Sequence, residues 1–361
     1  MLLTNATVDS NGSLSAPLPV DKAVACVILG LACVIGIPGN LIVIWTILVN
    51  VKRRSSTLML ILTLAVADLV MLVTLPFWIY SLGDGWVFGL VFWKLSVYLI
   101  FTSMYSSVFL ITAMSVERLV GVLQPFVIQK WQQKGAVRKV IVCILLLSFL
   151  LAVPNVTLEI KLDAKGRPLQ RMHSSARQEM GFLLLEALVG FLLPFTTLSI
   201  SYSAISQRIK QMTCQSKSRA GKLIASIVIS FVLCWLPYHA VNLIRVTSLS
   251  TMHWNAALAD RLGQVYRATK DAVGALAFIS SCINPILYAF AARNFKTGLK
   301  VPNLIKVFEQ MNGSFKERRD KESIDNEHRS ESADRLKLRD ALLKPIPTFP
   351  SGADTEKLAG I

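Results

Sequence analysis

Seven apolar stretches, each long enough to cross a lipid bilayer as a helix, follow one another along this chain of 361 residues. About 20 apolar residues in a helix span the roughly 30 Å of hydrocarbon in a bilayer. The first stretch, residues 23–49, contains no charged side chain. The sequence therefore predicts an all-α membrane protein, a bundle of seven transmembrane helices with a short amphipathic cytoplasmic helix. The expected spans are residues 22–50, 56–82, 90–122, 138–156, 180–208, 221–247 and 268–290.

The chain divides into four segments. Residues 1–21 are expected to form an extracellular N-terminal segment, and residues 22–290 the seven-helix bundle. Residues 291–310 place Phe295, Lys296 and Leu299 at helical spacing, which predicts an amphipathic helix next to the membrane. Residues 311–361 mix charges of both signs with prolines, which predicts a disordered cytoplasmic tail.

The orientation of the chain follows from its Lys and Arg residues, because cytoplasmic loops carry the excess of these side chains. Lys52, Arg53 and Arg54 follow the first span directly, whereas only Lys22 precedes it. We therefore expect a multi-pass protein of the plasma membrane with an extracellular N-terminus and a cytoplasmic C-terminus. Asn5 and Asn11 begin glycosylation sequons in that outer segment and are expected to carry glycans.

Composition and spacing argue against several classes of function. The net charge of +16 would suit a nucleic-acid partner only if the basic side chains shared one face, and here separate loops divide them. The four histidines lie on different segments, so no enzyme active site, metal centre or resident cofactor is expected. No pair of interrupted helices recurs in two halves of the chain, which disfavours a transporter. An intramembrane enzyme and a transporter stay as alternatives to a receptor.

Charged and proline residues within the spans call for a functional reason. An ionisable side chain at mid-span costs about 2.5–3.5 kcal/mol on insertion scales. Asp68 lies in the middle of the second span, Glu117 and Arg118 end the third, and Glu186 lies inside the fifth. Proline removes a backbone hydrogen bond and kinks a helix, and Pro237 and Pro285 interrupt the sixth and seventh spans.

Together with their neighbours, these residues make the chain resemble the rhodopsin-like (class A) G-protein-coupled receptors over about residues 25–305. The matching strings are Gly39-Asn40, Leu64-Ala65-Val66-Ala67-Asp68, Glu117-Arg118-Leu119, Pro194 with Tyr202, Cys234-Trp235-Leu236-Pro237 and Asn284-Pro285-Ile286-Leu287-Tyr288. The resemblance implies activation and G-protein coupling through Glu117, Arg118, Tyr202, Trp235, Pro237, Asn284, Pro285 and Tyr288. It also implies a pocket for an allosteric sodium ion formed by Asp68, Ser107, Ser280 and Asn284.

Within that family, strings such as Trp235-Leu236-Pro237-Tyr238-His239 are similar to those of the leukotriene B4 receptors. The likeness implies a lipid acid ligand, a hydroxylated eicosanoid, whose carboxylate pairs with a cation while its hydroxyls reach deeper polar groups. The residues expected to bind it are Lys94, Tyr98, Tyr105, Glu186, His239, Asn242, Arg245 and Lys270. A chemoattractant peptide receptor of the same fold stays open, because an anionic peptide C-terminus would suit the same cations.

The resemblance also implies partners inside the cell. A heterotrimeric G protein of the inhibitory class is expected, and arrestin and receptor kinases are expected to act on the serines of the tail. Two positions depart from the family pattern. Trp93 stands where the family carries the first cysteine of an outer disulfide, and Leu145 replaces the usual tryptophan of the fourth helix. Because that disulfide is typically worth about 2–4 kcal/mol, the position of the loop before the fifth span is expected to differ.

Overall fold

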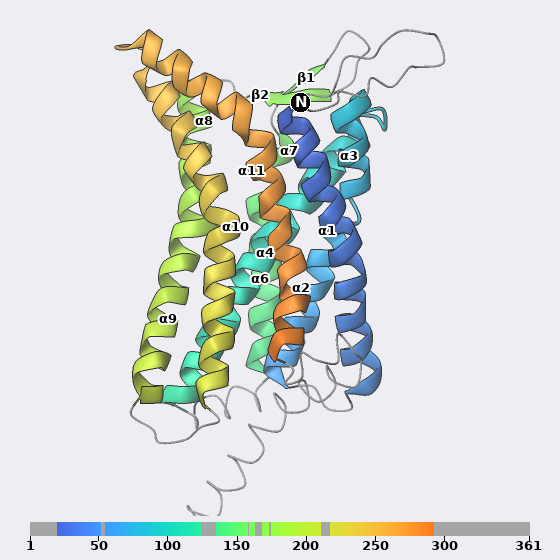
Figure 1. The fold of residues 1–361 in the computed structure, drawn as a ribbon, viewed down its shortest axis with the longest axis vertical. Coiled ribbons are helices and arrows are strands. Elements are labelled where there is room, and N and C mark those ends of the chain that lie inside the picture. Colours follow the sequence, from blue (N-terminus) through green and yellow to red (C-terminus); the bar gives the residue numbers. More distant parts are fainter. Residues whose placement is uncertain are drawn as a thin grey trace, which may run out of the picture. The chain divides into compact units, whose positions relative to one another are not determined.

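The structure, a computed structural model, describes residues 20–51, 55–124, 127, 135–157, 159–162, 168–172, 175–210 and 217–291. Six helical spans in this part of the chain are long and apolar enough to cross a bilayer. The helix α11 (Ala256–Ala291) forms the seventh span of the bundle. The predicted bundle is therefore confirmed (Figure 1). All but the first residue of the predicted amphipathic helix, and the segments that hold Asn5, Asn11 and the tail, lie outside the described residues.

Several spans consist of more than one helical segment. The first two comprise α1 (Val20–Trp45) with the π-helical turn η1 (Thr46–Asn50), and α2 (Ser56–Leu72) with α3 (Leu75–Asp84). The third and fourth comprise α4 (Leu90–Leu123), and α6 (Ala136–Ala152) with α7 (Pro154–Thr157). The fifth comprises α8 (Ala176–Ala187), the π-helical turn η2 (Leu188–Leu192) and α9 (Leu193–Lys210), and the sixth is α10 (Lys217–Thr251).

The sixth and seventh helices are longer than the sequence predicted. α10 continues to Thr251 and α11 begins at Ala256, whereas apolar length predicted residues 247 and 268. Asn255 caps α11, because the Leu258 backbone N–H donates a hydrogen bond to its Oδ1 over 3.0 Å. Ser248 then ties the two helices together by donating to the Ala259 carbonyl oxygen over 2.8 Å. The first turns of α11 are polar, so a criterion based on apolar runs does not detect them.

A short antiparallel hairpin precedes the fifth span. β1 (Glu159–Leu162) pairs with β2 (Pro168–Met172), with Glu159 opposite Met172. The sequence analysis expected no strand there. The hairpin lies at the end of the bundle where α1, α8 and α11 begin and α10 ends, and this end is called the hairpin end below (Figure 1).

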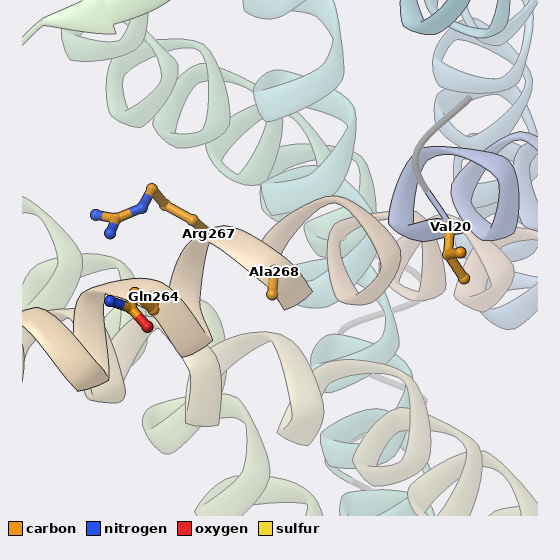
Figure 2. A pocket seen from close by; sticks show the side chains of 4 residues that line it. All are labelled: Val20, Gln264, Arg267 and Ala268. Atoms are coloured by element: carbon orange, nitrogen blue, oxygen red, sulfur yellow. The ribbon is translucent and has the colours of Figure 1, made fainter. Parts of the chain in front are cut away.

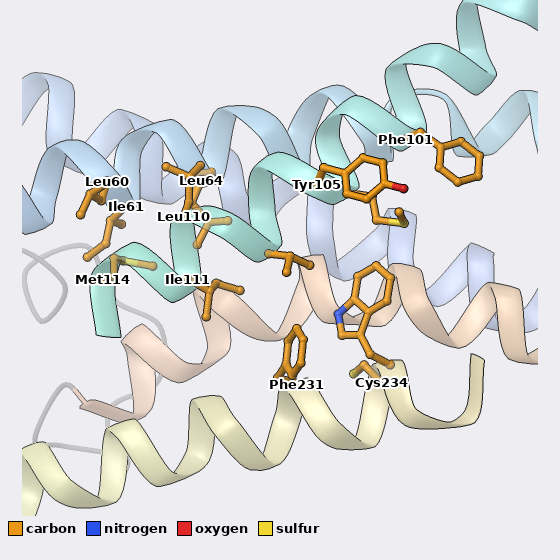
Figure 3. Close-up of a cluster of buried hydrophobic side chains, with 14 of the residues drawn as sticks. Leu60, Ile61, Leu64, Phe101, Tyr105, Leu110, Ile111, Met114, Phe231 and Cys234 are labelled. Carbon is orange, nitrogen blue, oxygen red and sulfur yellow. The ribbon is translucent and has the colours of Figure 1, made fainter. Parts of the chain in front are cut away.

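α4 lies in the interior of the bundle, where it packs against α2, α6 and α9. In the most apolar stretch of α4, 67% of the residues are buried, against 17% in α6, whose apolar side chains are left to face lipid. Leu64 of α2, Leu110 of α4 and Phe231 of α10 belong to the same buried cluster (Figure 3). Side chains on α4 can therefore contact residues of most other spans.

Glycine and asparagine bring α1 into close contact with α11. Asn40 is 1% exposed and donates from Nδ2 to the Gly36 carbonyl oxygen (2.9 Å) and to the Ser281 carbonyl oxygen (3.1 Å). A Cβ built on Gly36 would lie only 2.7 Å from Cys282 Sγ, and one on Gly39 would lie 3.1 Å from a Pro285 carbon. Small residues let helices approach closely enough for packing and hydrogen bonding inside a membrane.

Aromatic side chains hold the start of α4 at the position where the resemblance implies a disulfide. Trp93 is 6% exposed, and its ring centroid lies 6.3 Å from that of Trp78. Trp86 stacks on Phe92 at 5.7 Å and donates from Nε1 to the Gly89 carbonyl oxygen over 2.8 Å. Gly89 has a φ of +81°, which glycine adopts without a steric penalty. The described part of the chain thus positions this turn by ring packing, and its five cysteines are free thiols.

Replacing Gly36 by alanine is expected to destabilise the bundle, because the new Cβ would lie 2.7 Å from both Cys282 Sγ and Leu72 Cδ1. Overpacking of this kind typically costs about 1–3 kcal/mol. Gly30→Ala is the matched control on the same helix, since a Cβ there meets no atom within 4 Å. Thermal unfolding in detergent should give a lower melting temperature for Gly36→Ala than for Gly30→Ala. Equal melting temperatures would contradict the close α1–α11 contact.

Candidate functional site

A carboxylate and a phenol meet where the fifth span packs against the sixth. Glu186 on α8 is 3% exposed, and the Tyr238 hydroxyl on α10 donates a hydrogen bond to Glu186 Oε1 over 2.7 Å. The two residues face one another because α8 and α10 pack side by side. A hydrogen bond to a charged group contributes about 1.5–3 kcal/mol. The pair therefore stabilises a hydrogen-bonded polar group inside an otherwise apolar part of the bundle.

A group of rings and one histidine surrounds the same region of α10. His239 is 2% exposed, and its ring stacks on Phe191 at 5.1 Å and on Trp235 at 6.1 Å. Phe191 belongs to η2, and π-helical turns occur frequently at functional sites. A Cβ on the neighbouring Gly190 would lie 3.8 Å from Tyr105 Cε1 and 3.9 Å from His239 Cε1. Glycine at this position thus lets the rings of α4 and α10 approach the turn.

Several buried polar atoms on these helices have no hydrogen-bond partner among the described residues. On α10 they are both ring nitrogens of His239 and Nδ2 of Asn242, and on α4 they include the hydroxyls of Ser96, Thr102 and Ser106. Leaving such a group unpaired costs about 1–3 kcal/mol, so a bound molecule with hydroxyls would gain by pairing with them. The sequence analysis named His239 and Asn242 but missed the three α4 hydroxyls. The dense run of Ser and Thr at residues 102–107 was the available signal for Thr102 and Ser106.

The predicted cations differ in their partners. Arg245 donates to Glu179 twice, from Nε to Oε1 at 2.7 Å and from Nη2 to Oε2 at 3.1 Å. Lys270 Nζ lies 2.6 Å from Asp271 Oδ1. Lys94, half-buried near the start of α4, forms no ion pair with any described residue. Lys94 is therefore the predicted cation that could pair with a ligand acid without losing a protein partner.

Tyr98 is placed away from this cluster. Its hydroxyl donates to the Phe149 carbonyl oxygen of α6 over 3.2 Å, and the two rings lie 6.2 Å apart. Tyr105, two turns further along α4, is instead 4% exposed and stacks on Phe109. Of the two tyrosines predicted on α4, the structure brings Tyr105 but not Tyr98 to the region of His239.

A second polar centre surrounds Asp68, which has no exposed surface. Ser107 Oγ donates to its Oδ1 over 2.7 Å, and Asn284 Nδ2 donates to its Oδ2 over 2.8 Å. Ser280, expected in this group, donates its hydroxyl over 2.7 Å to a carbonyl oxygen one turn earlier in its own helix. Ser281, the next residue of α11, lies beside the Asp68 carboxylate instead. The second, third and seventh spans meet here.

The predicted coupling residues on α4 follow. Glu117 is 6% exposed, and its Oε2 accepts a hydrogen bond from Thr57 Oγ1 over 2.9 Å. Arg118, the next residue on α4, is half-buried, and Thr57 is the described hydrogen-bond partner of the neighbouring Glu117 carboxylate. The other predicted activation residues are Tyr202, half-buried on α9, Pro237 inside α10, Pro285 inside α11, and Tyr288 on α11, whose side chain is outside the described part.

An open hollow lies between the first turn of α1 and the polar start of α11 (Figure 2). Its lining residues are Val20, Gln264, Arg267 and Ala268, all of them exposed. Ligand sites are concave and mostly enclosed by apolar walls. The hollow lacks such walls, so the cluster around His239 is the better candidate for a binding site.

Comparison with known proteins gives a consistent result. Residues 39–288 match the family described as the seven-transmembrane receptors of the rhodopsin family. Leukotriene B4 receptor 1 of Homo sapiens is 36% identical over 307 residues, which cover 84% of this chain and 86% of that protein. Leukotriene B4 receptor 2 of Mus musculus is 33% identical over 279 residues, 75% of this chain and 76% of that protein. C-X-C chemokine receptor type 1 of Oryctolagus cuniculus is 30% identical over 283 residues, 77% of this chain and 79% of that protein.

Replacing Tyr238 by phenylalanine should lower the stability of the protein by about 1–3 kcal/mol, because Glu186 then loses a hydrogen bond while staying buried. Tyr80→Phe is the matched control, since Tyr80 is 47% exposed and its hydroxyl has no described partner. Melting temperatures of the two purified variants provide the measurement. If Tyr238→Phe had the same melting temperature as Tyr80→Phe, the pair at the α8–α10 contact would not contribute to stability.

Proposed function

The chain belongs to the rhodopsin family of seven-transmembrane receptors, and we propose that its ligand is a hydroxylated lipid acid, leukotriene B4 in the first place. Membership of the family makes the chain a multi-pass membrane receptor that acts through a heterotrimeric G protein, not an enzyme. The proposal adds the ligand, a plasma-membrane location with the N-terminus outside, and coupling to the inhibitory class of G protein. It adds arrestin and receptor kinases as partners of the tail.

The observation that carries the proposal is the polar and aromatic cluster around Glu186, Tyr238 and His239. It combines ring surfaces with buried nitrogen atoms of His239 and Asn242 that lack partners in the described part of the chain. An eicosanoid would contribute about 0.8 kcal/mol for each methylene it buries against such rings. Its hydroxyls would meet unpartnered atoms such as Asn242 Nδ2. The names of the relatives, leukotriene B4 receptors 1 and 2, point to the same ligand class.

The ligand carboxylate is assigned to the cations of the hairpin end. Lys94 has no ion-pair partner among the described residues, so an acid that pairs with it displaces no described carboxylate, whereas Arg245, the second cation, is paired with Glu179. Arg245 stands seven residues beyond Tyr238, about two helical turns toward the hairpin end. A charge-assisted hydrogen bond of this kind is worth about 1.5–3 kcal/mol.

Signalling follows from a shift in population between two arrangements of the helices. A ligand shifts such an equilibrium only by binding one arrangement more tightly than the other. Contact with His239 bears on Trp235, on which its ring stacks, and Pro237 lies between them in a helix that it kinks. We expect the far half of α10 to move outward, which opens the face on which Arg118 meets the G protein.

An allosteric sodium ion at Asp68 is part of the proposal. The residues fit a hard cation, because a fully buried carboxylate is joined by oxygen-bearing side chains of Ser107, Ser281 and Asn284. No described lysine or arginine forms an ion pair with Asp68. The ion would supply the neutralising charge, and the three spans that meet at Asp68 would then be held in the silent arrangement.

A chemoattractant peptide is the second candidate ligand. The similarity to C-X-C chemokine receptor type 1 favours it, although that relative is less similar than the leukotriene B4 receptors named above. A peptide would use its C-terminal carboxylate at the same cations.

A cell-based G-protein sensor tests the assignment directly. Cells that express the chain should respond to leukotriene B4, and its methyl ester should be roughly 10- to 150-fold less potent, since the ester loses one charge-assisted contact. Chemotactic peptides of the same net charge serve as the competing class. A response to peptides with silence toward lipid acids would overturn the lipid assignment.

Arg118→Ala is the control within that experiment. It should abolish the sensor response while binding of labelled leukotriene B4 persists, because Arg118 lies near the end of α4, roughly 20 Å of helix beyond Tyr105. A normal response in Arg118→Ala would exclude the proposed coupling face.

A further inference from the structure

The fifth and sixth spans are joined by two polar contacts in matching register. Glu186 accepts a hydrogen bond from Tyr238, and Glu179 pairs with Arg245. The two acids are seven residues apart on α8, and their partners are seven residues apart on α10 in the opposite direction. Seven residues are about two turns, or roughly 10 Å, of helix. The two contacts therefore follow one another along the same antiparallel pair of helices, α8 and α10.

The Arg245–Glu179 contact, which is the one nearer the hairpin end, also involves α11. The Arg245 guanidinium lies 5.5 Å from the centroid of the Tyr266 ring on α11, which is cation–π distance. The Arg245 and Glu179 side chains are only 25% and 19% exposed, and both nitrogen–oxygen contacts are short. A bidentate arginine–carboxylate pair with this degree of burial is stronger than an exposed ion pair. Arg245 thus links α8, α10 and α11 at the hairpin end.

We propose that the Arg245–Glu179 ion pair is a latch that favours the silent arrangement of the helices, and that a ligand carboxylate opens it by replacing Glu179 on Arg245. The first half of the proposal concerns the chain without ligand. The second half rests on the proposed lipid acid ligand.

The geometry supports an exchange of acids. Asn242, on the same face of α10 between Tyr238 and Arg245, carries a buried Nδ2 without a described partner. A ligand that bonds Asn242 through a hydroxyl therefore brings an acid group one turn further on within reach of Arg245. Glu179 occupies the Nε and Nη2 edge of the Arg245 guanidinium, so a ligand acid that takes this edge displaces Glu179. Once Arg245 is released from Glu179, this ion pair no longer holds α10 to α8.

Three variants and one control test the latch in intact cells at matched surface expression. Glu179→Gln keeps the side-chain shape and removes the charge that holds Arg245. Arg245→Gln removes the other partner. The double variant Glu179→Arg with Arg245→Glu restores an ion pair with the charges exchanged. Asp260→Asn is the control, since it breaks an exposed 3.7 Å pair with Arg267 within one helix and also removes one acid from the hairpin end.

Ligand-free signalling is the first readout. Glu179→Gln and Arg245→Gln should each raise basal G-protein activation several-fold, the charge-exchanged double variant should return it to the wild-type level, and Asp260→Asn should leave it unchanged. Unchanged basal signalling in both single variants, or a failure of the double variant to restore it, would overturn the latch.

Potency of leukotriene B4 is the second readout. Glu179→Gln should increase potency about tenfold, because the ligand acid no longer displaces a competitor. Arg245→Gln and the double variant should lose potency for the acid but not for its methyl ester. Equal potency of the acid in wild type and Glu179→Gln would overturn the exchange of acids. Silence of the wild-type chain toward lipid acids, with basal signalling raised in Glu179→Gln, would sink the ligand assignment and the exchange while supporting the ligand-free latch.

Discussion

A bilayer offers no water to a buried polar group, so such a group in the bundle is stabilised by a partner on its own backbone or on another helix. Asp68 meets this constraint by accepting hydrogen bonds from the third and seventh spans, and Asn40 meets it by donating to the backbone of α11. Glu117 accepts from Thr57 across the second and third spans. These few contacts fix which helices are neighbours, and apolar packing around α4 fills the space between them.

The same constraint explains how ligand binding at one end of the bundle can affect helices at the opposite end. Where polar atoms stay without a partner in the described residues, as at His239 and Asn242, the bundle is incomplete and a ligand with matching groups can complete it. These atoms lie on α10, near Trp235 and Pro237, and the same helix is tied to α8 near the hairpin end through Arg245. A change in partners at the hairpin end therefore acts on a helix that reaches the opposite half of the bundle.

Signals carried by single positions could be read from the sequence. Apolar length gave seven spans, and the cost of a buried charge marked Asp68 and Glu186 before any contact was known. Properties that depend on the register between helices could not be read in this way. The pairing of Arg245 with Glu179, the choice of Ser281 over Ser280, and the turn of Tyr98 toward α6 each follow from how two helices pack. The packing of Trp93 against Trp78 likewise depends on how two spans meet, so it could not be predicted from the sequence.

The distance between the end of α4 and the half of α10 away from the hairpin end tests the central claim most directly. Leu123 on α4 and Ile229 on α10 are 47% and 57% exposed, so spin labels on cysteines at both positions, with Cys143 and Cys214 replaced by serine, would report that distance in purified receptor. Addition of the lipid acid should shift the population toward a longer distance, and Glu179→Gln should shift it in the same direction without ligand. A distance distribution that stays unchanged while the ligand binds and the G protein is activated would contradict coupling through α10.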